Sequence, residues 1–250
     1  MIFSIFYCLY FCAFAQAAYV FSSANGAVAN LTYRSVALTT NGERQFVGLE
    51  LGYLMRSSDY GSTWTNVIGL GVNNWIQVAT SSDGLHVAAI PYSGKGIYIS
   101  SDYGTNWALS VVIASEILEN IWYGLASSST GQQLVTTVKT SNDTGSNTIE
   151  TYDIYRSIDY GDTWIKCNIT TRGGEWGTTG LASSANGKQL VAAAISEFLY
   201  LSTDYGVTWS ALSSSVPNTS PPTLVRILII IYLFFKNKYS RKCIKFELFI

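Results

Sequence analysis

The stretch SSDYGSTW at residues 57–64 decides the fold, because the chain writes it again three times in nearly the same letters. The later copies read SSDYGTNW at 100–107, SIDYGDTW at 157–164 and STDYGVTW at 202–209. The tryptophans that end these four octapeptides lie 43, 57 and 45 residues apart. A period near 45 residues is typical of propeller blades or solenoid units, so the octapeptide is interpreted first as part of a repeat fold and only then for any chemistry.

Other segments repeat in step with the octapeptide. Glycine turns such as VATSSDG (78–84) and LASSSTG (125–131) precede short apolar runs, and an aromatic-rich segment leads into each octapeptide. Each unit therefore reads strand, glycine turn, strand, loop, strand, octapeptide, strand, which predicts an all-β chain of four-stranded antiparallel propeller blades. No segment sustains a helical period, except that 115–120 leaves room for a helix. The predicted blades lie near residues 31–67, 75–110, 122–166 and 176–212.

The two ends of the chain differ from the repeats. Residues 1–17 combine an apolar run with small residues in the pattern of a secretory signal peptide, although no Lys or Arg precedes the run, so a buried first strand is the alternative. The propeller is expected over 18–222, where 19–29 is a degenerate octapeptide strand or a strand that completes another blade. The apolar and basic tail 223–250 lies outside the blades. It is either foreign to the fold or a membrane anchor whose span, 224–235, is short for a bilayer.

The net charge and the targeting signals of the chain limit the kinds of partner and the cellular location that are expected. Between residues 18 and 222 there are 9 basic and 15 acidic residues, a net charge of −6, which argues against a nucleic-acid partner. Membrane association is expected only if 224–235 is an anchor. The leader predicts a secreted or lumenal protein, with a membrane-anchored protein as the alternative. Four N-glycosylation sequons agree with that route, and they begin at Asn30, Asn142, Asn168 and Asn218.

The pattern S-x-D-x-G-x-T-W resembles the Asp-box, or BNR repeat, of sialidases and related propellers. The relatives include sortilin-type receptors, photosystem II assembly factors and xyloglucan hydrolases. Three copies match the pattern throughout, while the second has Asn106 in place of Thr. The resemblance covers about 30–212 and implies a β-propeller, either truncated from six or more blades or closed with four. The structural Asp-box residues are Ser57, Asp59, Gly61, Trp64, Ser100, Asp102, Gly104, Trp107, Ser157, Asp159, Gly161, Trp164, Ser202, Asp204, Gly206 and Trp209.

The chemistry of the octapeptide is expected to be structural. Its Asp accepts hydrogen bonds from backbone N–H groups of the turn, its Gly supplies a positive φ, and its Trp packs beneath the turn. A calcium loop would need alternating oxygen ligands that the octapeptide lacks. No metal and no cofactor are therefore expected.

Strand alternation places the octapeptides and the glycine turns on one face of the blades. The resemblance implies that a site would lie on the opposite face, as in sialidase-like enzymes. The aromatic residues there predict either a sugar-stacking platform or blade packing, and the acids predict either a carboxylate pair or simple solvation. The candidate ligand residues are Trp75, Trp122, Glu150, Asp153, Arg172, Glu175 and Trp176.

Known catalytic constellations do not fit the sequence. A sialidase needs three converging arginines, yet Arg56 and Arg156 precede octapeptides, Arg44 adjoins a glycine turn, and only Arg172 belongs clearly to the opposite loops. The single histidine, His86, aligns with apolar residues and is predicted to lie in the core, so no triad or histidine-rich zinc site is available. No residue is assigned a catalytic role.

The sequence thus predicts a secreted or lumenal, non-enzymatic propeller that binds a protein or glycan on the face opposite the octapeptides. The alternative is a glycoside hydrolase of sialidase or xyloglucanase type, incomplete or diverged. An assembly factor like the photosystem propellers is a third hypothesis, by analogy alone.

Overall fold

The computed structural model describes residues 32–92, 96–111, 119–143, 148–169, 176–194 and 199–211. Several predictions made above fall outside these ranges: the leader 1–17, the segment 19–29, the tail 223–250, the sequons at Asn30 and Asn218, and the candidates Arg172 and Glu175. Among the described helices, none has the length and apolar character needed to cross a membrane.

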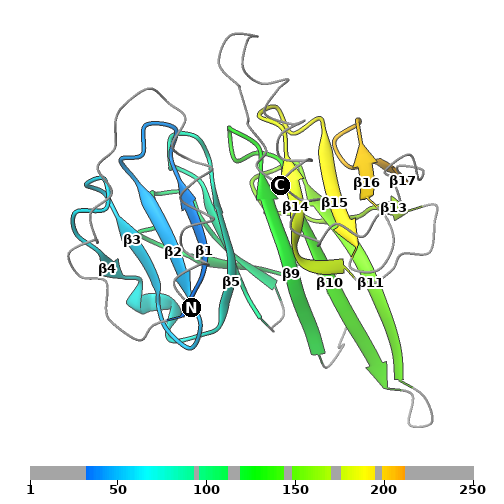
Figure 1. Cartoon of the computed structure of the whole chain (residues 1–250), viewed down its shortest axis with the longest axis horizontal. Coiled ribbons are helices and arrows are strands. Elements are labelled where there is room, and N and C mark those ends of the chain that lie inside the picture. The colour runs from blue at the N-terminus through cyan, green and yellow to red at the C-terminus, as the bar shows by residue number, and fades with distance from the viewer. Residues whose placement is uncertain are drawn as a thin grey trace, which may run out of the picture. The chain divides into compact units, whose positions relative to one another are not determined.

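Four sheets form the described chain, and each is built on four consecutive antiparallel strands, which confirms the predicted all-β propeller blades (Figure 1). Blade 1 consists of β1 (Tyr33–Leu38), β2 (Gln45–Leu49), β3 (Leu54–Ser57) and β4 (Thr65–Asn66). Blade 2 consists of β5 (Trp75–Thr80), β6 (Val87–Pro91), β7 (Gly96–Ser100) and β8 (Ala108–Val111). Blade 3 consists of β9 (Glu119–Ser127), β10 (Leu134–Asp143), β11 (Thr148–Ser157) and β12 (Ile165–Lys166). Blade 4 consists of β14 (Trp176–Ser183), β15 (Leu190–Ala194), β16 (Leu199–Ser202) and β17 (Thr208–Ala211).

Two short elements depart from the simple pattern. A single 3-10 turn, η1 (Ile68–Leu70), follows blade 1. The strand β13 (Asn168–Ile169) follows blade 3 and pairs in parallel with β17, so the sheet of blade 4 has five strands. Within 115–120, where the sequence left room for a helix, Glu119 and Asn120 instead begin strand β9.

Strand register corrects one sequence alignment. The serines that open the octapeptides pair with equivalent residues of the neighbouring strand: Ser100 with Val87 and Ser157 with Leu134. His86 therefore precedes the core position by one residue, and it is half-buried rather than buried. Its backbone N–H donates to the hydroxyl of Ser81, 3.0 Å away, so this histidine belongs to the glycine turn.

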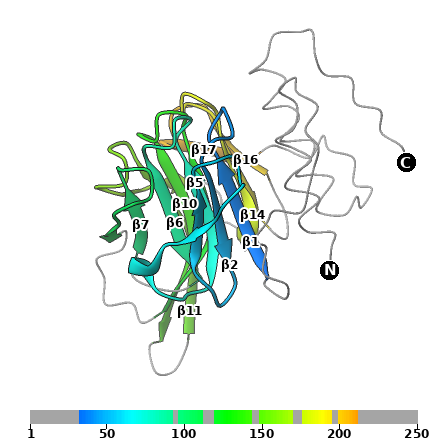
Figure 2. The same ribbon diagram turned by 90° about the vertical axis from the view of Figure 1, so that its left-hand side faces the viewer.

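The described chain divides into two compact units, the first holding blade 1 and most of blade 2 and the second holding blades 3 and 4. Unit 1 takes the described residues up to Leu109 except Gly96, and unit 2 takes the remainder. Within unit 1 the two sheets pack through a shared apolar cluster, and Figure 2 has this unit turned toward the viewer. We call the side of a blade that contacts the preceding blade its leading face and the opposite side its trailing face.

In unit 1, the leading face of blade 2 packs on the trailing face of blade 1. Blade 1 contributes Ala37, Phe46 and Leu54 to the cluster. Blade 2 contributes a set of four side chains, one from each strand or from the octapeptide: Val78, Ala89, Tyr98 and Trp107. Because alternate side chains of a strand point to the same face, one register supplies the whole set.

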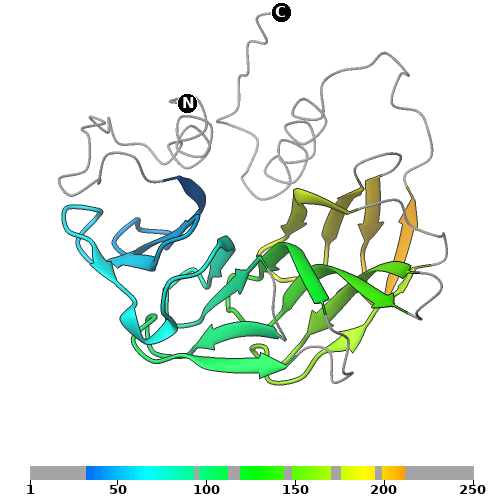
Figure 3. The same cartoon turned by 90° about the horizontal axis from the view of Figure 1, so that it is seen from below.

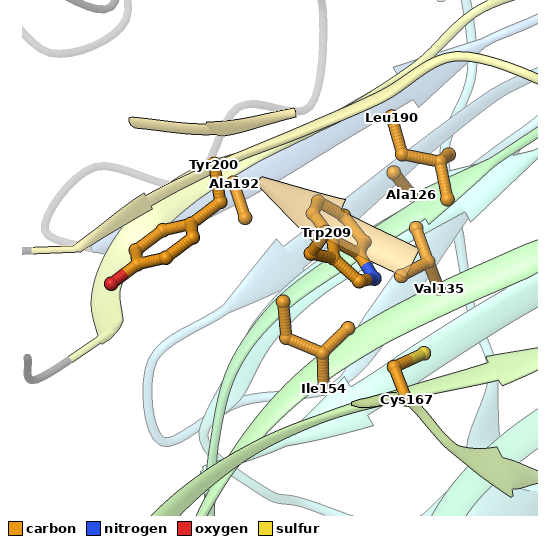
Figure 4. Packing of buried hydrophobic residues seen from close by; sticks show 8 residues of the cluster. All are labelled: Ala126, Val135, Ile154, Cys167, Leu190, Ala192, Tyr200 and Trp209. Carbon is orange, nitrogen blue, oxygen red and sulfur yellow. The ribbon is translucent and has the colours of Figure 1, made fainter. Parts of the chain in front are cut away.

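Unit 2 repeats this arrangement at equivalent positions, and its sheets are seen from another direction in Figure 3. The trailing face of blade 3 contributes Ala126, Val135 and Ile154. The leading face of blade 4 contributes Leu181, Ala192, Tyr200 and Trp209. Figure 4 shows Trp209 among Val135, Ile154 and Leu190, with Cys167 beside them. Packing between blades is thus repeated residue by residue along the chain.

Candidate functional site

The first octapeptide folds into a turn closed by its own side chains. The hydroxyl of Ser57 donates to Asp59 Oδ1 at 2.7 Å and accepts the N–H of Gly61 at 2.9 Å. Asp59 also accepts the backbone N–H and the hydroxyl of Thr63, at 2.8 and 2.6 Å. The indole N–H of Trp64 donates to the carbonyl of Gly61 at 3.1 Å. These hydrogen bonds all join groups within the octapeptide, so its polar side chains serve to close its own turn.

The other three octapeptides make the same bonds. In blade 2, Asn106 replaces Thr and still reaches Asp102, through its backbone N–H at 2.8 Å and its amide Nδ2 at 2.7 Å. The departure from the repeat pattern therefore leaves the turn intact. The tryptophan N–H bonds to the glycine carbonyl at 3.0 Å in blade 2 and 3.1 Å in blades 3 and 4.

The sequence did not reveal that the tyrosine of each octapeptide also has a left-handed backbone. The φ angles are 60° at Tyr60, 62° at Tyr103, 63° at Tyr160 and 61° at Tyr205, and the glycine that follows each is also positive. A residue with a side chain pays on the order of 1 kcal/mol or more in this region. The Ser and Asp that precede the tyrosine hold the backbone there, because they accept hydrogen bonds from N–H groups that follow it, as in the first octapeptide.

These bonds also explain the electrostatics of the turns. The hydroxyl of Thr63, followed by its backbone N–H and by Ser57, lowers the pKa of Asp59 to about 2. The pKa values of Asp102, Asp159 and Asp204 are also lowered, because hydrogen bonds to their charged forms outweigh desolvation. Each turn is therefore built around an ionised carboxylate.

The face that carries the turns is a structural face. The N–H of Tyr60 donates to the carbonyl of Glu43 in the glycine turn at 3.0 Å, so the two turns of blade 1 adjoin, as predicted. Arg44 lies over the ring of Tyr103, 4.2 Å from its centre. Arg56 donates to Thr105 Oγ1 at 2.8 Å. Both arginines therefore connect blade 1 to the turn of blade 2, and neither is placed for a substrate on the opposite face.

At the opposite edge of unit 1, backbone bonds fix a group of loops. Gly52 and Asn73 form a two-way bridge, with N–H to O distances of 2.9 Å in both directions. The N–H of Tyr92 donates to the carbonyl of Asn74 at 2.7 Å. Leu51, beside the bridge, has a left-handed φ of 52°. Loops from blade 1, from the connection to blade 2 and from blade 2 are therefore tied together.

These loops expose apolar side chains, which we call the apolar rim: Leu51, Ile68, Val72 and Tyr92. Leu51 is 79% exposed and Ile68 is 75% exposed, which is unusual for such large apolar residues. Next to them, Arg34 and Glu50 form an ion pair at 2.5 Å on the solvent side. Sequence reasoning missed the apolar rim because its members do not recur in phase with the blades.

Two tryptophans predicted as candidate ligand residues are removed from that set by their burial. Trp75 and Trp122 are each 0% exposed, so neither ring offers a face for a sugar. Trp75 packs in the cluster of unit 1, with its ring 5.6 Å from that of Tyr98 in an edge-on arrangement. The alternative interpretation, blade packing, accounts for both residues. Trp176 lies at the start of β14, at the equivalent position of blade 4.

The acidic candidates lie on β11 of unit 2. Asp153 forms an ion pair with Lys166, with 2.7 Å between its Oδ2 and the Lys166 Nζ, and only 16% of the Asp153 side chain is exposed. Glu150 pairs with Ser141 in the same hairpin, three residues from Asp153. A carboxylate pair that includes Glu150 stays a prediction.

Unit 2 carries an aromatic group that the sequence did not single out. Tyr123 and Tyr152 stack with ring centres 6.5 Å apart and planes 23° apart. The ammonium group of Lys139 lies 5.7 Å from the centre of the Tyr152 ring. All three side chains are half-buried. Across the described ranges, no three His, Cys, Asp or Glu side chains gather in a group suited to a metal ion.

Comparison with solved structures supports the propeller assignment. A GH74 xyloglucanase from Xanthomonas campestris matches with a TM-score of 0.54 and 18% identity over 71% of this chain. This chain spans only 30% of the length of that enzyme. Together with the four antiparallel sheets, the likeness assigns the chain to the β-propeller fold.

Other propellers resemble the chain more loosely. YCF48 from Cyanidioschyzon merolae matches with a TM-score of 0.47 and 13% identity, over 72% of this chain and 56% of that one. A structure of YCF48 bound to D1 peptide matches with a TM-score of 0.37 and 17% identity, over 77% and 71% of the two chains. No family model and no curated protein matches the sequence.

Proposed function

We propose that this chain is a non-enzymatic β-propeller that binds a protein or a glycan on the face opposite the octapeptide turns. The observation that carries the proposal is the apolar rim of unit 1, where four large side chains are exposed on loops tied by backbone hydrogen bonds. Solvent-exposed apolar groups framed by polar ones are typical of binding surfaces. Here the Arg34–Glu50 ion pair supplies the polar frame.

The loops are suited to binding because little ordering remains to be done. The bridge between Gly52 and Asn73 and the bond from Tyr92 to Asn74 hold the rim before a ligand arrives. A fixed surface loses less conformational entropy on association than a flexible one. Tyr92 also offers an aromatic ring, 42% exposed, for contact with an apolar side chain or a sugar face.

The proposal is tested by screening the full chain against a glycan array and a peptide library, followed by titration of the best ligand. The variant Val72→Glu is expected to weaken binding at least about tenfold, since it places a charge in an apolar contact. Val207→Glu is the matched control, because Val207 is 47% exposed and lies in an octapeptide. Equal effects of both variants would contradict the proposal.

The glycoside hydrolase hypothesis is separated by turnover. The protein is incubated with a fluorogenic sialoside and with xyloglucan, and the variant Asp153→Asn is run in parallel. Hydrolysis that this substitution abolishes would replace a binding function with a catalytic one. Binding without turnover supports the first proposal.

We also infer that the four octapeptides are Asp-boxes of the BNR type. The support is their shared geometry: the Ser hydroxyl, the Asp carboxylate, the Gly backbone and the Trp indole make equivalent bonds in each blade. In this proposal the boxes serve architecture, and the ligand lies elsewhere.

We propose that the chain is secreted or lumenal, with membrane attachment through 224–235 as the alternative. The sequon at Asn168 offers a direct test, because Asn168 is exposed on β13. Expression in a glycosylating eukaryotic host is expected to give a protein whose mobility on a gel shifts on digestion with an N-glycosidase. The variant Asn168→Gln should lose one step of that shift. An unglycosylated product retained in the cytosol would overturn the assignment.

A further inference from the structure

The glycine turns of the four blades share a side-chain arrangement that the proposed function does not use. In each turn, one side-chain oxygen bonds to a hydroxyl two residues before it and accepts a backbone N–H from two residues after it. The residue that supplies this oxygen is Asn41 in blade 1, Asp83 in blade 2, Thr130 in blade 3 and Asn186 in blade 4. One place in the repeat thus accepts three kinds of side chain.

Two of these four residues begin an Asn–Gly pair. Asn41 precedes Gly42 and Asn186 precedes Gly187, and both asparagines are exposed. Glycine has no side chain to shield its backbone nitrogen, so this nitrogen can attack the amide carbon of the preceding Asn. An Asn–Gly pair is therefore the place in a chain where an asparagine amide is most readily lost.

The reaction at Asn41 needs only water. The backbone nitrogen of Gly42 loses its proton and forms a bond to Asn41 Cγ, the bond from Cγ to Nδ2 breaks, and ammonia leaves with that proton. Water then opens the resulting five-membered imide at one of its two carbonyl carbons. Opening at one carbonyl gives aspartate, and opening at the other gives isoaspartate, whose main chain runs through the former side chain.

The geometry of the turn both favours and delays this attack. Asn41 Oδ1 accepts the hydroxyl of Thr39 at 2.7 Å and the N–H of Glu43 at 3.1 Å, and these bonds draw electrons from Cγ. The N–H of Gly42, however, donates to the carbonyl of Thr39 at 2.9 Å, and the equivalent N–H of blade 4 is held at the same distance. The turn must open before the nitrogen can attack, so conversion is expected to be slower in the folded chain than in the unfolded one.

Blade 2 shows that an aspartate fits this place in the turn. Asp83 Oδ1 accepts the hydroxyl of Ser81 at 2.6 Å and the N–H of Leu85 at 3.0 Å, which are the bonds that the asparagines make. The Ser81 hydroxyl, followed by the Leu85 N–H, lowers the pKa of Asp83, so an ionised carboxylate belongs to this turn. The aspartate product can therefore keep the turn closed where its surroundings accept a negative charge. Isoaspartate cannot, because the extra carbon in its main chain changes the spacing on which these bonds depend.

The two asparagines differ in their surroundings. Asn41 Nδ2 donates to Glu43 Oε2 at 3.0 Å, so conversion replaces this donor with an oxygen and sets two carboxylates against each other. The carbonyl of Glu43 also accepts the N–H of Tyr60, which ties this turn to the first octapeptide. Asn186 has Lys188 in the place of Glu43, and its turn holds no acidic residue. A new carboxylate therefore meets a like charge in blade 1 and is followed by a cation in blade 4.

We propose that Asn41 and Asn186 are sites of spontaneous conversion to aspartate and isoaspartate, and that the aspartate product weakens the turn of blade 1 but not that of blade 4. The reaction requires no enzyme, since the turn supplies the attacking nitrogen and the solvent supplies the water. The residue two places after the asparagine decides how well the product is tolerated.

The first test is incubation of the full chain at mildly alkaline pH in water enriched in heavy oxygen, followed by peptide mapping with mass spectrometry. Heavy oxygen is expected at Asn41 and Asn186, because water opens the imide, and it should enter faster in urea than in the folded chain. Asn66 and Asn74, neither of which precedes a glycine, are internal controls and should stay unlabelled. Asn41→Thr and Asn186→Thr, which introduce the residue found in blade 3, should each lose one label. Absence of label at either asparagine of the folded parent chain would overturn the proposal.

The second test compares the two turns with permanent aspartates. Asn41→Asp is expected to lower the melting temperature by about 2–4 °C, because a hydrogen bond is lost and like charges meet. Adding Glu43→Gln should restore most of this loss, since the glutamine amide can donate to the new carboxylate. Asn186→Asp is the matched variant and should stay within about 1 °C of the parent chain. Equal losses at the two positions, or no rescue by Glu43→Gln, would overturn the assigned difference between the turns.

Discussion

Units 1 and 2 share their packing between blades. They differ in the side chains that cover the octapeptide turn where two blades meet, a place that we call the seam. In unit 1, an added Cβ on Gly104 would lie 2.7 Å from a ring carbon of Phe46, so an aromatic ring of blade 1 closes over this turn. In unit 2, the equivalent Gly206 faces Leu190 at 3.1 Å and the aliphatic part of Arg156 at 3.2 Å. The backbone of the turn is the same in the two units, while the side chains that cover it differ: a ring of the preceding blade in unit 1, and in unit 2 Leu190 of the same blade with Arg156 of the preceding one.

This difference shows that two separate factors determine the structure at each turn: the hydrogen bonds inside the octapeptide and the side chains that pack against it. The octapeptide fixes its own backbone through internal hydrogen bonds, and it therefore tolerates different surroundings. The seam depends on volume, since rigid and flexible side chains fill the same place in the two units. Substitutions can separate the two factors.

The largest effect is expected where the octapeptide Trp is most deeply packed. Trp209 is 2% exposed in unit 2, whereas Trp64 of unit 1 is half-buried. Trp209→Ala should lower the free energy of unfolding by about 3–5 kcal/mol, through lost apolar burial and the cavity left behind. Trp64→Ala should cost less. Urea denaturation of both variants measures the difference, and equal losses would show that the comparison of burial is misleading.

A smaller effect should come from the turn glycines. Gly104→Ala and Gly206→Ala both force a side chain into positive φ, at a cost of about 1 kcal/mol each. At Gly104 the new methyl group also meets the rigid ring of Phe46, which adds about 1–3 kcal/mol. Thermal denaturation should therefore rank Gly104→Ala as the more harmful. The opposite ranking would show that the seam of unit 1 relaxes more easily than that of unit 2.

The arginines of the seam should contribute less than the glycines. Arg56 makes an exposed hydrogen bond to Thr105, and such surface contacts are worth about 1 kcal/mol or less. Arg56→Ala and Arg156→Ala are expected to lower the unfolding free energy by at most about that amount. Chemical denaturation at low and high salt checks this, with Arg34→Ala as an exposed control away from the turns. A loss several times larger at either seam would contradict the ranking.

The smallest expected effect on stability comes from the ionised octapeptide Asp, which both units share. The pKa of Asp59 is lowered to about 2, so its contribution to stability is present above the usual carboxyl pKa of 3.8 and is lost as the pH falls toward 2. Asp59→Asn should therefore flatten the stability curve of the chain between about pH 4 and pH 2. Asp159→Asn should act in the same direction, because its pKa is also lowered. Opposite slopes in the two variants would break the equivalence of the turns.

Much of the fold could be predicted from the sequence because its repeats are in register. The octapeptide, the glycine turn and the strand length recur together, so the four blades fall close to their predicted ranges. A one-residue error in alignment was enough to misplace His86, because neighbouring residues of a strand point to opposite faces. The positive φ of the tyrosines was also missed, since Tyr gives no sign of that conformation.

The candidate ligand surface was harder to predict for a physical reason. Repetition identifies what every blade needs, and Trp75 and Trp122 are repeated because they fill the interior. A binding surface is instead made by residues that differ between blades, such as Leu51 and Tyr92. Their exposure is set by local loop geometry, including the bridge between Gly52 and Asn73, which no sequence period records.

The short strand β13 has a consequence for solubility. The outer edge of a sheet offers unpaired backbone groups to any other extended chain, and proteins suppress this hazard by shortening or covering the edge. Blades 1 and 3 end in two-residue strands, β4 and β12, which offer little length for pairing. Blade 4 ends in the longer β17, and there β13 occupies two edge positions, opposite Thr208 and Trp209. The segment that follows blade 3 thus covers part of the edge of blade 4 and reduces the backbone available for pairing in fibrous aggregates.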